Sequence, residues 1–214
     1  MFLAIDYGEA RCGLALGERL VAKLWTVERE KLFSELSKFP DIEAYVVGLP
    51  FSMSGRYSEQ TFKVIAFAER LHKKYGKRVY MIDERLSSKI FKGSKDVDRL
   101  SAAEIFDRFV SSDRNRYEIR PPSKLSDETV AELNNLTGKI LIANLSDTRV
   151  AKDENCVVYQ VDPYYAYLFY KRGFHVERDL KQLENSAPFD MIVAGGSCEE
   201  FRTFLRPSGK ILCL

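Results

Sequence analysis

Histidine and tryptophan are scarce in this chain of 214 residues, which holds two histidines and one tryptophan. His72 and His175 lie far apart in the sequence, so there is little material for a histidine metal cage or a histidine-based catalytic triad. Any acid–base or metal chemistry is therefore expected to fall mainly on carboxylates.

Paired cysteine motifs are also missing. The four cysteines are Cys12, Cys156, Cys198 and Cys213. They are scattered and form no CxxC pair, which favours reduced, buried thiols over a disulfide or zinc framework. We therefore expect all four to be free.

Long apolar runs are absent as well, because no stretch approaches the roughly 18–20 apolar residues of a membrane span. The chain begins directly with a predicted strand, without a basic leader or a cleavage site, so secretion is not expected. We expect a cytoplasmic protein with no membrane association. Hydrophobic residues make up 45% and charged residues 30% of the chain, an ordinary globular composition. The length suits one large domain or two small ones.

Strand and helix patterns alternate through the first half of the chain. Residues 2–16 predict a strand, a tight turn and a second strand. The further predicted strands are 20–27, 44–49 and 78–84, and the predicted helices are 28–39, 58–75 and 97–110. This half carries 21 Lys and Arg against 17 Asp and Glu over residues 1–116, so it is the half more suited to a polyanion.

A polar segment at 111–124, with Pro121-Pro122 and no periodicity, marks the best domain boundary. We predict a first domain at 1–115, a linker at 116–124 and a second domain at 125–214. Alternating strands and helices in the second domain predict a parallel sheet with helices on its faces. The strands expected there are 139–145, 157–162, 174–177, 190–194 and 210–214, with helices at 127–136, 164–171, 180–185 and 198–205.

Three acids of the first half lie where an apolar residue is expected. Asp6 is in the first strand, Glu84 ends the strand at 78–84, and Asp98 opens a helix on the same stripe as its apolar residues. Three carboxylates that converge at one end of a sheet repel one another, and a hard divalent cation relieves that repulsion. The pattern therefore favours a Mg²⁺ or Mn²⁺ site, of the kind that can hold two ions at a phosphodiester.

Each acid has a structural alternative. Asp6 could cap a turn, and Asp98 could cap its helix, where the dipole favours an acid. Glu84 could pair with Arg85 or Arg78 at the strand end. The metal-site hypothesis therefore depends on the three acids together.

Five separated segments carry a family resemblance. In order they are IDYGEARCGLAL, VVGLP, FAERLHKKYG, DERLSS and VDRLSAAEIF. This order resembles the YqgF/RuvX family of RNase H-like nucleases over about residues 2–112. The resemblance implies an RNase H-like mixed sheet flanked by helices, and it implies that Asp6, Glu84 and Asp98 form the acidic trio.

The resemblance also implies Mg²⁺ or Mn²⁺ as cofactor and a metal-dependent endonuclease that acts on structured nucleic acid. The implied substrates are the precursor of 16S rRNA and branched, Holliday junction-like DNA. The chain departs from the family at Ser52-Met53-Ser54-Gly55, where the family loop usually resembles NMDG, and in the short segment between DERLSS and VDRLSA. These departures motivate the alternative of a catalytically decayed protein that binds nucleic acid or ribosomes.

A rim of basic residues is predicted around the acids, where Lys and Arg would contact phosphates. These residues are Arg11, Arg56, Arg85, Lys89, Lys92 and Lys95. Tyr7 and Tyr57 are candidate stacking partners for unpaired bases. The alternative is that most of them are solvated surface residues. A symmetric cut of a junction would need two active sites, and hence a homodimer.

The second domain resembles the sheet core of Rossmann-like, methyltransferase-type domains, through GKILIANL, VVYQVDP, FDMIVAGG and LRPSGKILCL. Asp162 ends a strand where such enzymes often place a ribose-binding acid. The turn SDTRVAKDE after Leu145 has no glycine, however, so the usual cofactor cradle is missing. Gly195-Gly196-Ser197 is either an anion site or a plain turn. We expect a degenerate Rossmann-like module without a small-molecule cofactor, which could dock a partner, dimerise or extend the nucleic-acid surface.

Overall fold

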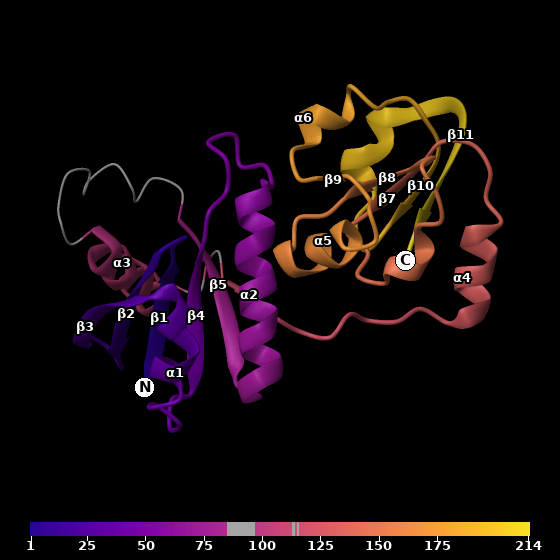
Figure 1. Ribbon diagram of the computed structural model, residues 1–214. Coiled ribbons are helices and arrows are strands. Elements are labelled where there is room, and N and C mark those ends of the chain that lie inside the picture. The colour runs from indigo at the N-terminus through magenta and orange to yellow at the C-terminus, as the bar shows by residue number, and fades with distance from the viewer. Residues whose placement is uncertain (85–96, 113, 115) are drawn as a thin grey trace. The chain divides into compact units, whose positions relative to one another are not determined.

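The computed structural model describes residues 1–84, 97–112, 114 and 116–214. Within them the chain forms two compact units (Figure 1). Unit 1 comprises residues 1–53 and 58–119, and unit 2 comprises residues 54–57 and 120–214. Both are α/β structures, as the sequence predicts.

Unit 1 is built on a mixed six-stranded sheet with the order β3-β2-β1-β4-β5-β6. The strands are β1 (Phe2–Tyr7), β2 (Arg11–Gly17), β3 (Val21–Glu28), β4 (Ala44–Leu49), β5 (Arg78–Asp83) and β6 (Arg116–Glu118). β1, β2 and β3 form an antiparallel meander, while β1, β4 and β5 are parallel. The carboxyl ends of β1, β4 and β5 therefore meet at one edge of the sheet.

The described part of unit 1 also contains the helices α1 (Leu32–Leu36), which follows a 3-10 turn at Arg29–Lys31, α2 (Glu59–Tyr75) and α3 (Val97–Ser111). The start of α2 is fixed by a capping box, in which the Ser58 hydroxyl accepts a hydrogen bond from the Thr61 backbone N–H. The helix ends at Gly76, whose φ of 64° is the left-handed conformation that favours glycine.

Helix α3 packs on one face of the sheet through the apolar stripe that the sequence predicts. Ala102, Ile105 and Phe109 are 0%, 2% and 4% exposed. They contact a cluster of strand residues that point to the same face, namely Ala4, Ala15, Val46 and Ile82. Because side chains alternate along a strand, Asp6 follows Ala4 onto the α3 face, whereas Tyr7 points to the other face and stacks on Phe67 of α2.

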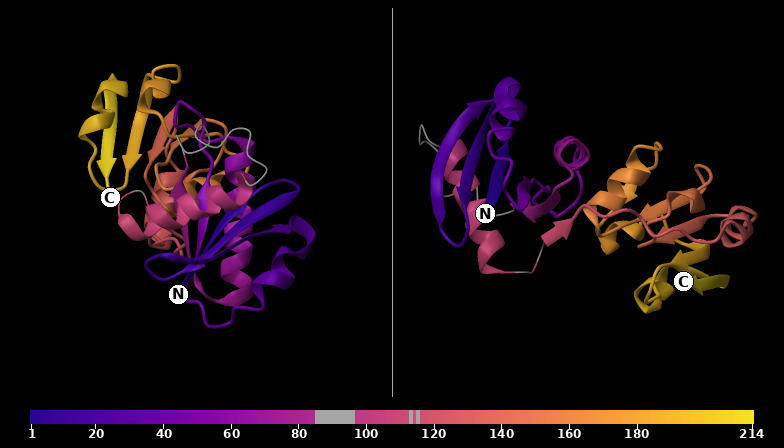
Figure 2. Two further views of the ribbon diagram at one scale, coloured as in Figure 1. Left: turned by 90° about the vertical axis from the view of Figure 1, so that its left-hand side faces the viewer. Right: turned by 90° about the horizontal axis from the view of Figure 1, so that it is seen from below.

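Unit 2 contains a parallel five-stranded sheet with the order β11-β10-β7-β8-β9. Its strands are β7 (Ile140–Ala143), β8 (Cys156–Tyr159), β9 (Val176–Glu177), β10 (Phe189–Ala194) and β11 (Leu205–Cys213). Its helices are α4 (Asp127–Asn134), α5 (Pro163–Tyr170) and α6 (Leu180–Leu183), with 3-10 turns at Thr148–Val150 and Glu199–Phe204. Figure 2 shows β11 in yellow at the edge of this sheet, beside β10. The predicted parallel, Rossmann-like arrangement is confirmed.

Several elements differ from the sequence prediction; for example, the helix predicted at 28–39 is a 3-10 turn at Arg29–Lys31 followed by α1 at Leu32–Leu36. The predicted linker at 116–124 begins with β6, which extends the first sheet by pairing antiparallel with β5. Its three residues are all half-buried and lack an alternating apolar pattern, so only the backbone pairing reveals the strand. The helix predicted at 198–205 is a 3-10 turn, and β11 begins at Leu205 rather than at 210.

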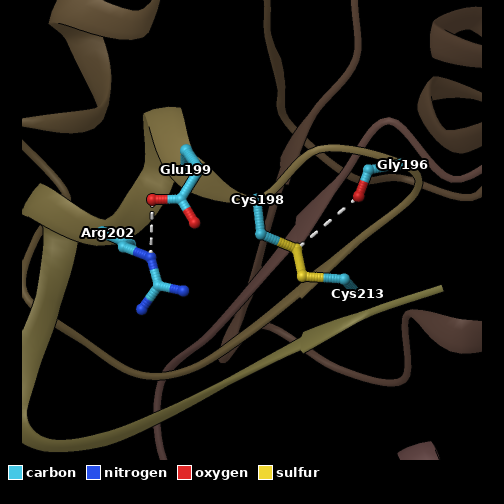
Figure 3. Close-up of a disulfide and its surroundings, with 5 residues drawn as sticks. All are labelled: Gly196, Cys198, Glu199, Arg202 and Cys213. Atoms are coloured by element: carbon cyan, nitrogen blue, oxygen red, sulfur yellow. Dashed lines mark hydrogen bonds and ion pairs between the residues drawn. A yellow bond between two sulfur atoms is a disulfide. The ribbon is translucent and has the colours of Figure 1, made fainter.

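The prediction of four free cysteines is wrong for two of them. Cys198 and Cys213 form a disulfide, with their Cα atoms 6.0 Å apart (Figure 3). Cys198 precedes the 3-10 turn that leads into β11, and Cys213 ends β11, which pairs with β10. The parallel pairing therefore brings together two cysteines that have no recognisable spacing in the sequence. Cys12 and Cys156 are free and buried, as expected.

Across the described residues, no helix combines the length and the apolar character that crossing a membrane requires.

Candidate active site

The three predicted acids come together at the edge of unit 1 where β1, β4 and β5 end. Asp6 is the penultimate residue of β1, and Glu84 directly follows β5. The Glu84 backbone N–H donates to the Leu49 carbonyl at 3.2 Å, which holds Glu84 beside the end of β4. Asp98 is the second residue of α3, and the first turn of this helix lies at the same edge.

Two glycines permit this convergence. Gly13 lies directly opposite Asp6 in the β1–β2 pair, and a Cβ there would overlap the Asp98 carbonyl. Gly48 lies in β4, and a Cβ there would overlap the Glu84 carboxylate. Each missing side chain thus makes room for an acid or for the helix that carries one.

A pocket of about 430 Å³ opens over this edge, and both Asp6 and Glu84 line it. Gly48, Tyr7 and Gln60 also line it. Two carboxylates from different strands therefore share one cavity.

The acids are close enough to perturb one another. Burial, followed by the negative charge of Asp98, raises the pKa of Asp6 to about 6, while a hydrogen bond from Ser101 acts in the opposite direction. Burial, followed by the charge of Asp6, raises the pKa of Glu84 to about 8, and the nearby Arg108 opposes this. The pKa values of both Asp6 and Glu84 are raised, so full ionisation of the site is unfavourable at neutral pH and would be favoured by a bound cation.

The donor set fits a hard divalent cation, because it consists of carboxylate oxygens around a cradle that a Cβ at Gly48 would fill. Arg11 now contacts the third acid, with its Nη2 atom 3.1 Å from Asp98 Oδ2. Over residues 1–84, 97–112, 114 and 116–214, no three His, Cys, Asp or Glu side chains are already arranged around a common metal position. Asp98, whose side chain is 30% exposed, would have to leave Arg11 to join Asp6 and Glu84.

Two residues of α3 support the acids and were not predicted from the sequence. Ser101 hydrogen-bonds the Asp6 carboxyl group. Arg108 lies near Glu84, donates to the Asp83 carbonyl at 3.0 Å and is paired with Glu104 at 2.6 Å. Ser101 and Arg108 follow Asp98 at i+3 and i+10, on one face of the helix. This spacing from Asp98 was the sequence feature that could have identified them.

The predicted rim residues fall into three groups. Arg11 lies at the site, where it pairs with Asp98. Tyr7 lines the pocket, but one face of its ring stacks on Phe67 at 3.9 Å and the Arg29 guanidinium lies 4.7 Å from the ring centroid. A base could stack on Tyr7 only if Arg29 moved.

Arg56 and Tyr57 belong to unit 2. Arg56 Nη2 lies 2.8 Å from Glu177 Oε2, and the Tyr57 hydroxyl donates to the Gln160 carbonyl at 2.8 Å. Arg85, Lys89, Lys92 and Lys95 lie outside the described residues.

Asp162, predicted to end a strand, lies three residues beyond the end of β8 and has a structural role in unit 2. Asp162 caps α5 by accepting hydrogen bonds from the backbone N–H groups of Tyr164 and Tyr165, at 2.8 and 3.2 Å. Burial raises the pKa of this carboxyl group, and the two hydrogen bonds oppose the rise. Gly195-Gly196-Ser197 leads into the 3-10 turn at 199–204.

The family comparison covers the unit that carries these acids. Residues 1–112, which carry all three acids, match the family model described as "RuvX: Holliday junction resolvase". The chain belongs to the RuvX family. The matched range covers nearly all of unit 1.

Individual relatives of the family differ in length. A Thermotoga maritima protein named "Putative pre-16S rRNA nuclease" is 35% identical over 217 aligned residues, which cover the whole of this RuvX chain and 94% of the relative. A protein of the same name from Alcanivorax borkumensis is 36% identical over 129 residues, covering 53% of this chain and 97% of the relative. The first relative thus also matches unit 2, whereas the second is a shorter protein.

Proposed function

We propose that this RuvX protein is a metal-dependent endonuclease that hydrolyses phosphodiester bonds in structured nucleic acid. The observation that carries the proposal is the convergence of Asp6, Glu84 and Asp98 over Gly13 and Gly48, at one edge of the sheet. Acids with a purely structural role do not require glycines that make room for them at one edge of a sheet. Repulsion among the three carboxylates is unfavourable there unless a cation binds.

Asp6, Glu84 and Asp98 would hold Mg²⁺ or Mn²⁺. The cation would supply charge neutralisation and activation of water for attack on phosphorus. Ser101 orients Asp6 through its hydrogen bond, and Arg108 offsets part of the negative charge at Glu84. Arg11, released from Asp98, would face the substrate and contact a phosphate.

The proposed substrates follow from the relatives. Their name points to the precursor of 16S rRNA, and the family description points to branched DNA of the Holliday junction type. Symmetric resolution of a junction requires two active sites, so action on DNA would be accompanied by a homodimer, which light scattering can detect.

The direct test is cleavage of a precursor 16S rRNA fragment and of a four-way DNA junction, in Mg²⁺, Mn²⁺ and EDTA. We expect metal-dependent products from the wild-type chain and none from Asp6→Asn or Glu84→Gln. An exposed acid at the opposite edge of the sheet provides the control, since Asp41→Asn should cleave like the wild type. Binding without any metal-dependent product would instead identify a catalytically decayed nucleic-acid- or ribosome-binding protein.

For unit 2 we propose a degenerate Rossmann-like module that works without a small-molecule cofactor. The cap role of Asp162 supports this, because its carboxylate accepts hydrogen bonds from the backbone of α5. Calorimetry with S-adenosylmethionine tests it, and a micromolar affinity would refute it.

A further inference from the structure

Unit 1 carries a series of adjoining pockets that starts at the candidate active site. A second pocket, of about 760 Å³, shares Tyr7 and Glu9 with the pocket of the acids. A third pocket, of about 280 Å³, shares Phe33 and Arg70 with the second. The series therefore leads from the acids across the α1 and α2 side of the sheet to the last turns of α2. We call it the flanking track.

An aromatic ring with two cations above it forms the far part of the flanking track. Phe33 of α1 is half-buried, and its ring meets Phe67 edge-on with centroids 5.9 Å apart. Arg70 and Lys74, one helical turn apart on α2 and both exposed, lie 5.0 and 4.7 Å from the Phe33 centroid. A fixed ring is thus bordered by two long, solvated cationic side chains.

The charges along the flanking track are not uniform. Glu9, Glu28 and Glu30 line the second pocket, and Glu28 is paired with Lys31 at 2.6 Å. The third pocket is lined by cations alone besides Phe33, namely Arg70, Lys73 and Lys74, of which Lys73 is paired with Glu69 at 3.1 Å. The part of the track farthest from the catalytic acids is therefore the part best suited to a polyanion.

We propose that the flanking track binds an unpaired nucleic-acid strand that continues from the phosphodiester cleaved at Asp6 and Glu84. A base stacks on Phe33, and Arg70 and Lys74 move from the ring to the strand's phosphates, which is the combination that binds single strands without sequence preference. This inference rests on the proposed nuclease function, because the strand is defined as the flank of the cleaved bond.

The length of the flanking track sets the length of the strand. Gln60 of α2 lines the pocket of the acids and Lys74 of the same helix lines the third pocket. Fourteen residues at about 1.5 Å per residue correspond to about 21 Å. At about 3.4 Å per nucleotide, the rise of one fully stacked strand of B-DNA, this is at most about six nucleotides.

Binding without cleavage tests the track separately from the chemistry. Single-stranded oligonucleotides of three, six and twelve nucleotides are titrated by fluorescence anisotropy in EDTA, at several salt concentrations. We expect affinity to rise steeply from three to six nucleotides and to change little from six to twelve. The double variant Arg70→Ala, Lys74→Ala should bind the six-mer about tenfold more weakly, with a salt slope lower by about 1.4.

Two further variants complete the binding test. Phe33→Leu keeps an apolar side chain but removes the aromatic face, and should weaken binding by about fivefold or more. Arg19→Ala removes an exposed cation at the opposite edge of the sheet and should bind within twofold of the wild type. Thermal unfolding is used to check that each variant folds. If Phe33→Leu does not fold, the surface variants Arg70→Ala and Lys74→Ala still test the proposal. Equal binding by wild type and double variant, or no binding by the wild type, would overturn the proposal.

Cleavage assays separate this inference from the proposed function. On a hairpin substrate with a six-nucleotide unpaired flank, the double variant should lose about tenfold in kcat/KM, and on the same hairpin without the flank it should equal the wild type. Equal rates on both substrates would overturn the flanking track while leaving the nuclease in place. A wild-type chain that cleaves neither substrate with any metal, yet binds the six-mer through Arg70 and Lys74, would refute the nuclease and retain the track as a strand-binding surface.

Discussion

Replacement of Asp6 by Asn tests the claim that this carboxylate is a functional acid in an unfavourable position. The change removes a charge and preserves the shape of the side chain, and the amide can still accept the hydrogen bond from Ser101. In the absence of metal, burial and the charge of Asp98 raise the pKa of Asp6 from 3.8 to about 6. The variant should therefore be as stable as the wild type at low pH and more stable at pH 8.

The sign follows from proton linkage. A raised carboxyl pKa means that the folded state holds its proton longer than the unfolded chain, so the stability it contributes is complete below about pH 4 and is lost as the pH rises through the folded pKa. A rise of about two units, at 1.36 kcal/mol each, sets an upper estimate of about 3 kcal/mol for Asp6 at pH 8. Relief of Glu84, whose pKa of about 8 is raised in part by Asp6, acts in the same direction.

The assay is thermal and urea unfolding of wild type, Asp6→Asn and the control Asp41→Asn in EDTA, between pH 4 and pH 8.5. We expect Asp6→Asn to gain about 1–3 kcal/mol over the wild type at pH 8, or roughly 2–10 °C in Tm, and Asp41→Asn to gain little. Addition of Mg²⁺ should stabilise the wild type and not Asp6→Asn. An Asp6→Asn protein that is less stable than the wild type at pH 8 would show that Asp6 is a structural cap, and the reasoning would fail.

Three other substitutions probe the same site. Gly48→Ala places a Cβ in the volume of the Glu84 carboxylate. We expect cleavage to fall at least 100-fold and the free energy of unfolding to fall by about 1–3 kcal/mol. Near-normal cleavage would show that the position of the Glu84 carboxylate does not matter for activity. Ser101→Ala removes the hydrogen bond that lowers the pKa of Asp6, so the acidic limb of the pH–rate profile should move to higher pH. An unchanged acidic limb would show that Ser101 has no effect on the catalytic ionisation. Arg11→Ala breaks an ion pair whose arginine side chain is 59% exposed. The free energy of unfolding should change by less than about 1 kcal/mol, while KM for nucleic acid should rise. A larger loss of stability with an unchanged KM would show that Arg11 has a structural role.

Most helices and strands of unit 1 can be predicted from the sequence because the patterns that indicate them are local. The helical stripe of α3 and the apolar strands follow from periodicity alone, and the acids stand out because they interrupt it. The three acids could be singled out in advance, since Asp6, Glu84 and Asp98 interrupt apolar patterns that they share with buried residues such as Ala4, Ile82 and Ala102. Their convergence follows from the parallel order of β1, β4 and β5.

The remaining features depend on tertiary pairing. β6 is held by backbone hydrogen bonds to β5, and its side chains carry no pattern. The Cys198–Cys213 disulfide arises because β11 pairs with β10, and neither residue signals the other along the chain. The supporting role of Ser101 could have been read from its position three residues after Asp98, but only once Asp98 was taken to point at Asp6.

The most direct test of the central claim is metal binding measured apart from catalysis. A crystal of the protein soaked in Mn²⁺ and recorded at the manganese absorption edge locates the ion through its anomalous signal. We expect manganese within coordination distance of oxygens of Asp6, Glu84 and Asp98, with Asp98 released from Arg11, and no such peak in Asp6→Asn crystals. Crystals soaked in saturating Mn²⁺ that show no peak at these acids, with Asp98 still held by Arg11, would contradict the account.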